Sequence, residues 1–123
     1  MHNDLNNDGR KLLKFLAEVI LPYAVIDKRA DMVRNCISYK AVHEQLKLPR
    51  KAERWGKSLE LNGLANMAEW LFAQGLPAIS GLIVTEQIGA PEPTGYIPLM
   101  ERYKSDWLTE IKKSQLQDWK PYF

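Results

Sequence analysis

The first clear pattern in the chain is an apolar stripe at helical spacing. Steps of one, three and four residues separate Leu12, Leu13, Leu16, Val19 and Ile20. This spacing predicts a helix over residues 9–21, with Asp8 as its N-cap and Pro22 as the point where it kinks or ends. The stretch 23–27 can add a further turn or two of helix, and its boundary is the least defined in the chain.

Two shorter helices are predicted next, with a tight turn between them. Ser38 can cap a helix over residues 39–47, because its hydroxyl can accept a hydrogen bond from the first turn. Pro49 interrupts the helical pattern, and a second helix is predicted over residues 50–60. Two short helices joined in this way are typical of a helix-turn-helix.

The second half of the chain combines one strand signal with further helices. An apolar face over residues 64–74 predicts a helix that stops at Gly75 and that either continues the helix from residue 50 or is separated from it by a break at Gly63. Residues 82–85 are the strongest strand signal, since bulky apolar residues precede a β-branched Thr. After the turn-forming residues 89–95, a second strand is expected at 96–97, which would complete a β-hairpin.

The C-terminal part predicts one amphipathic helix and an aromatic tail. Tyr103, Trp107 and Ile111 recur at steps of four, which favours a helix over residues 99–114 with Pro98 as its first residue. Residues 118–123 hold three aromatic side chains, so we expect this tail to pack on the domain or on a partner.

The composition is that of one ordinary globular domain. The 123 residues are 46% hydrophobic and 26% charged, and the formal net charge is only +2, so any attraction to nucleic acid must come from local clustering. A single cysteine excludes an intrachain disulfide framework. No signal peptide is visible and the apolar stretches are too short to span a bilayer, so we expect a cytoplasmic protein without membrane contact.

Positive charge is concentrated in the predicted turn and second helix. The cations are Lys47, Arg50, Lys51, Arg54 and Lys57. Only Glu53 offsets them, and on a helix Arg50, Arg54 and Lys57 would share one face that can meet several phosphates. We add Tyr39, at the start of the first helix, to this DNA-binding set. The competing interpretation is a solvated helix face without a partner.

The order of elements over residues 37–97 resembles a winged helix-turn-helix, and it is loosely similar to the DNA-binding domain of alkylguanine-DNA alkyltransferases and alkyltransferase-like proteins. The matching positions are Ser38, Tyr39, Pro49, Gly56, Leu59, Asn62, Pro77, Ile83, Val84, Gly95 and Tyr96. The family's reactive Pro-Cys-His-Arg motif is Pro77-Ala78-Ile79-Ser80 here, and its arginine finger would fall at Glu53. The resemblance therefore implies the layout, without alkyl transfer.

No constellation of residues indicates an enzyme. His43 lies beside Glu44, and adjacent residues on a helix point in different directions, so His43 is expected at the surface or its boundary. Cys36 lies in an apolar setting that favours packing. The carboxylates form no close cluster, which leaves a nuclease built from separated carboxylates as the one open enzyme alternative, and no glycine-rich loop suits a phosphate. We expect no catalytic residues, no metal and no cofactor.

The sequence thus predicts a mainly α fold with a small β-hairpin, as a winged helix-turn-helix core flanked by N-terminal and C-terminal amphipathic helices. We expect a polar disordered start over residues 1–8, a single winged-helix-like domain over 9–117, and the tail over 118–123. The predicted function is non-catalytic binding of double-stranded DNA by the basic helix, with the 86–96 loop as the wing.

A protein-interaction module on the same scaffold is the second hypothesis. The predicted wing carries Glu86 and Glu92 and no cation, whereas a wing that contacts a DNA groove is usually basic. An adaptor, inhibitor or complex subunit would then bind its partner, or a second copy of itself, through this wing and the tail. The candidate residues are Glu92, Tyr96, Trp119, Tyr122 and Phe123.

Overall fold

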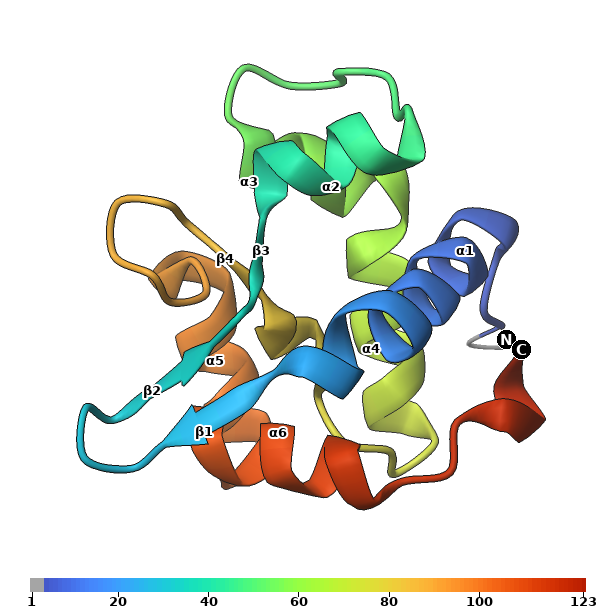
Figure 1. Cartoon of the computed structure of the whole chain (residues 1–123). Coiled ribbons are helices and arrows are strands. Elements are labelled where there is room, and N and C mark those ends of the chain that lie inside the picture. The colour runs from blue at the N-terminus through green and yellow to red at the C-terminus, as the bar shows by residue number, and fades with distance from the viewer. Residues whose placement is uncertain (1–3) are drawn as a thin grey trace.

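Helices dominate the chain, and a small antiparallel two-stranded hairpin lies beside them (Figure 1), in a computed structural model that describes residues 4–123. The α-helices are α1 (Asn7–Phe15), α2 (Tyr39–Leu46), α3 (Trp55–Leu59), α4 (Ala65–Ala73), α5 (Pro93–Tyr103) and α6 (Trp107–Leu116). Shorter helical turns are η1 (Leu16–Ile20), η2 (Leu21–Tyr23), η3 (Glu60–Leu64), η4 (Ile79–Leu82) and η5 (Lys120–Tyr122). The strands are β1 (Val25–Asp27), β2 (Met32–Arg34), β3 (Ile37–Ser38) and β4 (Ile83–Val84). Among the described helices, none has the length and apolar character needed to cross a membrane.

The N-terminal helix is confirmed, with a different cap. Asn6 Oδ1 accepts a hydrogen bond from Gly9 N at 2.7 Å, so Asn6 is the N-cap and Asp8 lies in the first turn. The helix continues through η1 into η2, where Pro22 contributes to its end. Its predicted apolar face is buried at Leu12, Leu13 and Leu16, although Val19 is half exposed.

Residues 4–6 differ from the disordered start that the sequence predicts. Asn66 of α4 accepts a hydrogen bond from Asn6 N at 2.9 Å and donates one to Asp4 O at 3.0 Å. Leu5 is buried in the core. This part of the chain is therefore attached to the domain, and residues 1–3 of the predicted start lie outside the described residues.

The antiparallel hairpin lies at residues 25–34. The sequence pattern predicts helix for residues 23–27 instead. β1 pairs with β2, and Asp27 Oδ1 accepts a hydrogen bond from Ala30 N at 3.1 Å inside the connecting turn. Asp31 adopts a left-handed φ of 53° in the same turn. The helix expectation is wrong because β-branched residues flank a polar four-residue turn, and this arrangement favours strand pairing.

The predicted hairpin over residues 82–97 is wrong. β4 confirms the strand signal, but it pairs in parallel with β3, with Ile37 opposite Ile83. Residues 96–97 lie in α5, which begins at Pro93. Proline is favoured in the first turn of a helix because its fixed φ suits the helix and its missing N–H has no partner there. The predicted wing is therefore a loop over residues 85–92 followed by a helix.

The predicted C-terminal helix over residues 99–114 is two helices. Lys104 has a left-handed φ of 54° and ends α5, and Pro98 lies inside α5 rather than at its start. Asp106 then caps α6, because its Oδ1 accepts a hydrogen bond from Thr109 N at 2.9 Å. In a continuous helix, Thr109 N–H would bond to a backbone carbonyl of the preceding turn. The Asp106 side chain takes the place of that carbonyl, and this favours a new helix start at Trp107.

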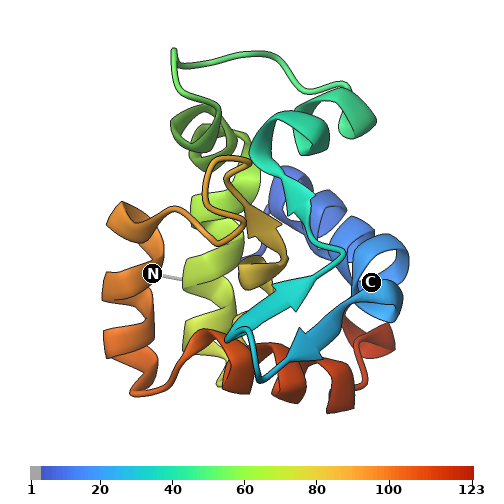
Figure 2. The same ribbon diagram turned by 60° about the vertical axis from the view of Figure 1, so that its left-hand side comes forward.

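The core lies where α1, α4, η4 and α6 meet, and the aromatic tail closes one side of it (Figure 2). Trp119 is 5% exposed, and its Nε1 donates a hydrogen bond to Ser114 O at 2.9 Å. Tyr122 lies edge-on to Trp70 with ring centroids 5.5 Å apart. The tail therefore packs on the domain itself.

Candidate functional site

The basic segment, which we define as residues 47–57, is mainly a loop. α2 ends at Leu46, and Lys47 follows with a left-handed φ of 54°. α3 begins only at Trp55, so Arg50 lies outside the helix. The prediction of a helix over residues 50–60 that presents Arg50, Arg54 and Lys57 on one face is therefore wrong.

Side chains from the following helical turns hold this loop in its path. Asn62 Nδ2 donates a hydrogen bond to Pro49 O at 2.8 Å, and Lys51 N donates one to Ser58 Oγ at 2.8 Å. Both Ser58 and Asn62 are buried. These hydrogen bonds satisfy backbone groups of the loop that the predicted helix would satisfy by its own i to i−4 bonds. The loop conformation is therefore favoured over the helix that the sequence predicts.

His43 also contacts Ser58, one of the two side chains that hold the loop. Its ring is buried, with Nδ1 2.9 Å from Tyr39 O and Nε2 2.9 Å from Ser58 Oγ. A carbonyl only accepts, so Nδ1 donates to Tyr39, and Nε2 of the neutral ring accepts from the Ser58 hydroxyl. The expectation of a surface or boundary histidine is wrong because its partner lies 15 positions away along the chain, a spacing with no sequence signal.

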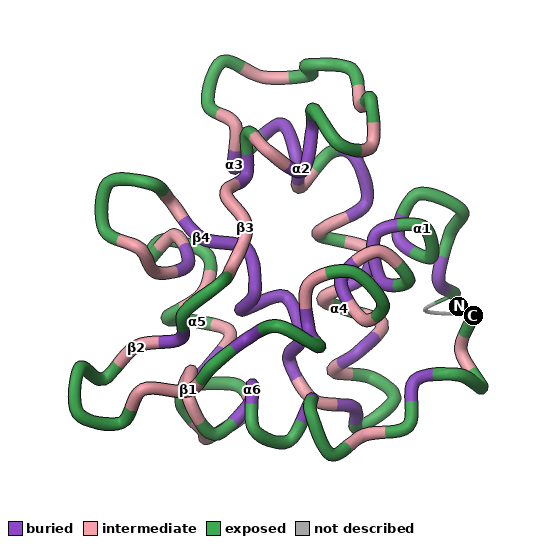
Figure 3. Tube along the Cα trace, viewed as in Figure 1, coloured by how far each residue is buried: buried purple, intermediate pink, exposed green. Residues whose placement is uncertain are grey.

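The five cations of the basic segment are exposed, and the connection between α2 and α3 is largely exposed around them (Figure 3). The Arg50 guanidinium lies over the Trp55 ring, 4.5 Å from its centroid, and donates to the carbonyl oxygens of Ala52 and Glu53. Lys51 Nζ donates to Leu61 O at 3.3 Å. These two cations are partly held by the backbone of their own region.

The other three cations differ in their ion pairing. Arg54 Nη1 lies 2.9 Å from Glu92 Oε1, and Lys57 Nζ lies 3.9 Å from Glu60 Oε2. Lys47 forms no ion pair within residues 4–123. Lys47 is therefore the cation of the segment that is most available to an external anion.

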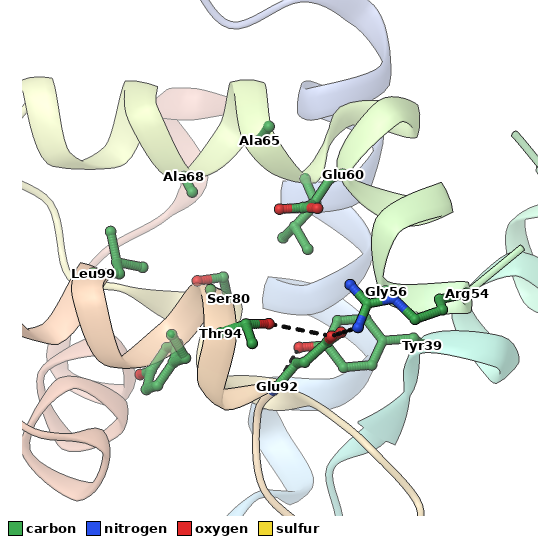
Figure 4. Close-up of a pocket in the computed structure, with 13 residues that line it drawn as sticks. Tyr39, Arg54, Gly56, Glu60, Ala65, Ala68, Ser80, Glu92, Thr94 and Leu99 are labelled. Carbon is green, nitrogen blue, oxygen red and sulfur yellow. Dashed lines mark hydrogen bonds and ion pairs between the residues drawn. The ribbon is translucent and has the colours of Figure 1, made fainter. Parts of the chain in front are cut away.

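Glu92 connects the basic segment to a neighbouring pocket (Figure 4). Its carboxylate pairs with Arg54 and accepts a hydrogen bond from Thr94 Oγ1 at 3.3 Å, while its backbone N–H donates to the Tyr39 hydroxyl at 2.9 Å. Burial raises the pKa of Tyr39, which keeps this phenol neutral. The predicted DNA-binding Tyr39 is thus a buried contact of Glu92.

The pocket has a volume of about 100 Å³ and lies between η3, α4, η4 and the start of α5. In Figure 4, Arg54 and Glu92 point toward one another at one end of it, and Leu99 and Ala68 lie toward the other. The buried hydroxyls of Ser80 and Tyr96 line it, and neither has a hydrogen-bond partner in the described chain. They can hold water or another small polar group.

The polar side chains of this pocket are hydroxyls, two carboxylates and one guanidinium. Its described lining contains no Cys, His or Lys. Burial, and secondarily the Glu110 carboxylate, raise the pKa of Tyr96, so its phenol is a poor source of phenolate. Ala78, in the Pro77–Ser80 stretch, is buried, and its N–H donates a hydrogen bond to Glu110 Oε1 at 3.1 Å.

The residues predicted to bind a partner protein are not brought together. Glu92 and Tyr96 line the pocket beside α5, whereas the tail lies away from α5 in both views (Figures 1 and 2). Trp119 is buried, Tyr122 is half-buried, and Phe123 is 37% exposed. A single docking surface built from all five is therefore absent within residues 4–123.

Lys40 is a cation near the site that the sequence reasoning missed. It is exposed in the first turn of α2 and lines an outer groove of about 510 Å³ with Arg54, Trp55 and Glu92. No sequence signal could have found it, because Lys40 lies at the start of the helix whose opposite end leads into the basic segment, and only the return of the chain at Arg54 and Trp55 brings them into one groove. It extends the cationic surface beyond residues 47–57.

Cys36 has the packing role that the sequence predicts. The side chain is half-buried, Sγ lies 3.5 Å from Val33 O, and burial raises the pKa of the thiol to about 11. No group of three or more His, Cys, Asp or Glu side chains in the described part of the chain is arranged to hold a metal ion.

No family model, curated protein or solved structure matches this chain. Function must therefore be inferred from the site itself, since a fold class alone does not determine function.

Proposed function

We propose that this protein binds double-stranded DNA without catalysis, through the basic segment. The observation that carries the proposal is that all five of its Lys and Arg side chains are exposed on a connection that projects at one end of the molecule (Figure 1). Cations on such a projection can replace the counterions condensed on the phosphate backbone, and release of those counterions favours binding.

The helix pair α2 and α3 would place this segment against the duplex. A winged helix-turn-helix would use α1, β3, α2, α3 and β4 in this order, although β1 and β2 lie between α1 and β3, α4 lies between α3 and β4, and no strand returns after β4 in the described chain. α3 has only five residues, and Arg50 precedes it. Phosphate contacts from the loop therefore outnumber base contacts from a helix in this proposal, so we expect weak sequence preference.

The anchored backbone supports binding as well. Ser58 and Asn62 hold residues 49 and 51 by hydrogen bonds in the unbound protein. A loop that is already ordered loses less conformational entropy when it meets a ligand. The cations can then contact phosphates without refolding of the segment.

Fluorescence anisotropy with a fluorescein-labelled duplex of random sequence tests this proposal, at two or more salt concentrations. We expect the logarithm of the binding constant to fall with the logarithm of salt concentration with a slope of about −3. The double variant Lys47→Glu/Lys51→Glu should weaken binding at least about tenfold at low salt.

The matched control is Lys28→Glu/Lys112→Glu, which changes the net charge equally at exposed positions outside the basic segment. This control should bind duplex with an affinity within about threefold of the unmodified protein. Binding that does not respond to salt, or an equal loss in both double variants, would contradict the assignment to residues 47–57.

A further inference from the structure

A second basic region lies between the β1–β2 hairpin and α6, which are side by side in Figure 2. These elements enclose a groove of about 690 Å³. We propose that the groove binds an acidic, partly apolar peptide segment of a partner protein. This inference does not rest on DNA binding, because the groove shares no lining residue with the basic segment.

The floor of the groove is apolar. Val25 is 50% exposed, and Ile26 and Leu108 are half-buried beside it. Apolar side chains left accessible in a concave surface favour a ligand that can cover them. A peptide with aliphatic side chains provides that cover, whereas a hydrated phosphate backbone does not.

Cations stand on both sides of this floor. Lys28 and Arg29 come from the hairpin turn, and Lys112 comes from α6. All three are exposed, and none of them forms an ion pair within residues 4–123. Cationic walls on either side of an apolar floor complement a peptide that carries both carboxylates and aliphatic side chains.

The one carboxylate among the residues that line the groove, Asp27, is already engaged. Asp27 Oδ1 accepts a hydrogen bond from Ala30 N at 3.1 Å and Oδ2 accepts one from Arg34 Nη2 at 2.9 Å, and these hydrogen bonds, first that of Ala30, lower the pKa of Asp27. Glu110 is buried, with Lys113 Nζ 3.5 Å from its Oε2. The surface that faces a ligand therefore remains positive, and a peptide carboxylate meets little repulsion.

A second copy of this chain is a poorer occupant than a separate partner. The loop over residues 85–92 carries two carboxylates, and Glu92 is already paired with Arg54. Docking of that loop into the groove of another copy would require this ion pair to break or would leave only Glu86 to meet the cations. A partner with several unpaired carboxylates matches the groove better.

Binding of synthetic peptides to the full chain tests the proposal. The probe is a fluorescein-labelled peptide of about ten residues in which Glu and Leu alternate, and the control peptide has Gln in place of Glu. We expect saturable binding of the Glu peptide with a dissociation constant below about 1 mM, and at least about tenfold weaker binding of the Gln peptide.

Two double variants locate the bound peptide. Lys28→Glu/Lys112→Glu should lower the affinity for the Glu peptide at least about tenfold, whereas Lys47→Glu/Lys51→Glu should leave it within about threefold of the unmodified protein. Circular dichroism and thermal unfolding of both variants check that the fold is retained. A Val25→Ser variant should weaken the Glu peptide as well, because it removes part of the apolar floor.

Three results would overturn the proposal. One is the absence of saturable peptide binding in the unmodified protein. Another is peptide binding that Lys28→Glu/Lys112→Glu leaves unchanged. The third is duplex DNA binding that this variant abolishes while the peptide does not bind, since nucleic acid would then be the occupant. Loss of DNA binding in Lys47→Glu/Lys51→Glu alone would concern only the proposed function.

Discussion

At the scale of single residues, each cation of the basic segment has a different local environment. Lys47 has no ionic partner in the described chain, Arg50 packs on Trp55, and Arg54 pairs with Glu92. Because an ion pair with an exposed arginine contributes at most about 1 kcal/mol, Arg54 can exchange Glu92 for a phosphate at small cost. In the proposed DNA complex, Glu92 would therefore lower the affinity of the basic segment for a phosphate.

This exchange predicts the effect of Glu92→Gln. The substitution removes the carboxylate that pairs with Arg54, so duplex DNA should bind about threefold more tightly. Glu101→Gln is the matched control, because Glu101 is exposed and forms no ion pair in the described chain. Anisotropy titrations compare the two, and an equal gain in both would mean that net charge alone accounts for the effect.

Gly63 is the glycine with the strictest conformational requirement. Its φ is +116°, and an added Cβ would lie 2.7 Å from the backbone C of Asp8. Gly63→Ala should lower the free energy of unfolding by about 2–3 kcal/mol, as measured by urea denaturation. Gly75 also has a positive φ, +70°, but open space around it, so Gly75→Ala should cost only about 1 kcal/mol. Equal losses would show that the contact between α1 and η3 adds nothing.

Glu110 is a buried carboxylate with a structural hydrogen bond. It is 1% exposed and accepts from Ala78 N. Glu110→Ala leaves this N–H unsatisfied and opens a cavity, so the free energy of unfolding should fall by about 3 kcal/mol. Glu110→Gln retains an acceptor oxygen and should lose about half of that or less. Thermal and urea unfolding measure both, and an unaffected Glu110→Ala would exclude this role.

At the scale of elements, the sequence predicts the helix ends that depend on interactions between residues close together in the chain. The Ser38 cap of α2 and the helix end at Gly75 both follow from interactions within a few residues, and both are present. The path of residues 47–54 depends instead on Asn62 and Ser58, and the partner of β4 is a strand more than forty positions earlier. Such long-range contacts produce no repeating pattern of apolar residues in the sequence, so they could not be predicted from it.

The basic segment likewise has features that local sequence predicts and features that depend on long-range contacts. The position of its cations can be read from the sequence, and their exposure can be predicted from the high local charge. Their arrangement could not, because the predicted helix would have placed Arg50 beside Arg54, whereas the anchored loop gives each a separate contact. The hairpin at 25–34 could have been predicted, since β-branched residues lie on both sides of its turn.

The cap of α6 predicts a pH effect on stability. Hydrogen bonds from Thr109 lower the pKa of Asp106 below 3.8 in the folded protein. The ionised form is thus favoured by folding, so its contribution is present above the unfolded pKa and is lost as pH falls through the folded pKa. Asp106→Asn keeps an acceptor at the cap but removes this titration.

Urea unfolding at about pH 6 and about pH 3 measures this effect. The unmodified protein should lose more stability between the two conditions than Asp106→Asn does. At the higher pH the two proteins should agree within about 0.5 kcal/mol, because Asn is also a good N-cap. An identical loss of stability in both would show that the Asp106 cap does not contribute to the pH dependence.

At the scale of the whole molecule, a net charge of only +2 conceals two separate basic regions. One lies on the connection between α2 and α3, which projects from the molecule in Figure 1, and the other lines the groove beside α6. Local charge on different surfaces can serve different partners even when the overall balance is nearly neutral. The two proposals together describe a small protein that could connect DNA to an acidic segment of another protein.

The most direct test of the central claim is a two-dimensional ¹H–¹⁵N NMR titration of the full chain with duplex DNA at low salt. We predict that the largest shifts occur at backbone amides of residues 47–57 and around Lys40, whose side chains surround the proposed contact. The amides around Lys28 and Lys112 should move little. No shifts at saturating DNA, or shifts centred on the groove beside α6, would contradict DNA binding by the basic segment.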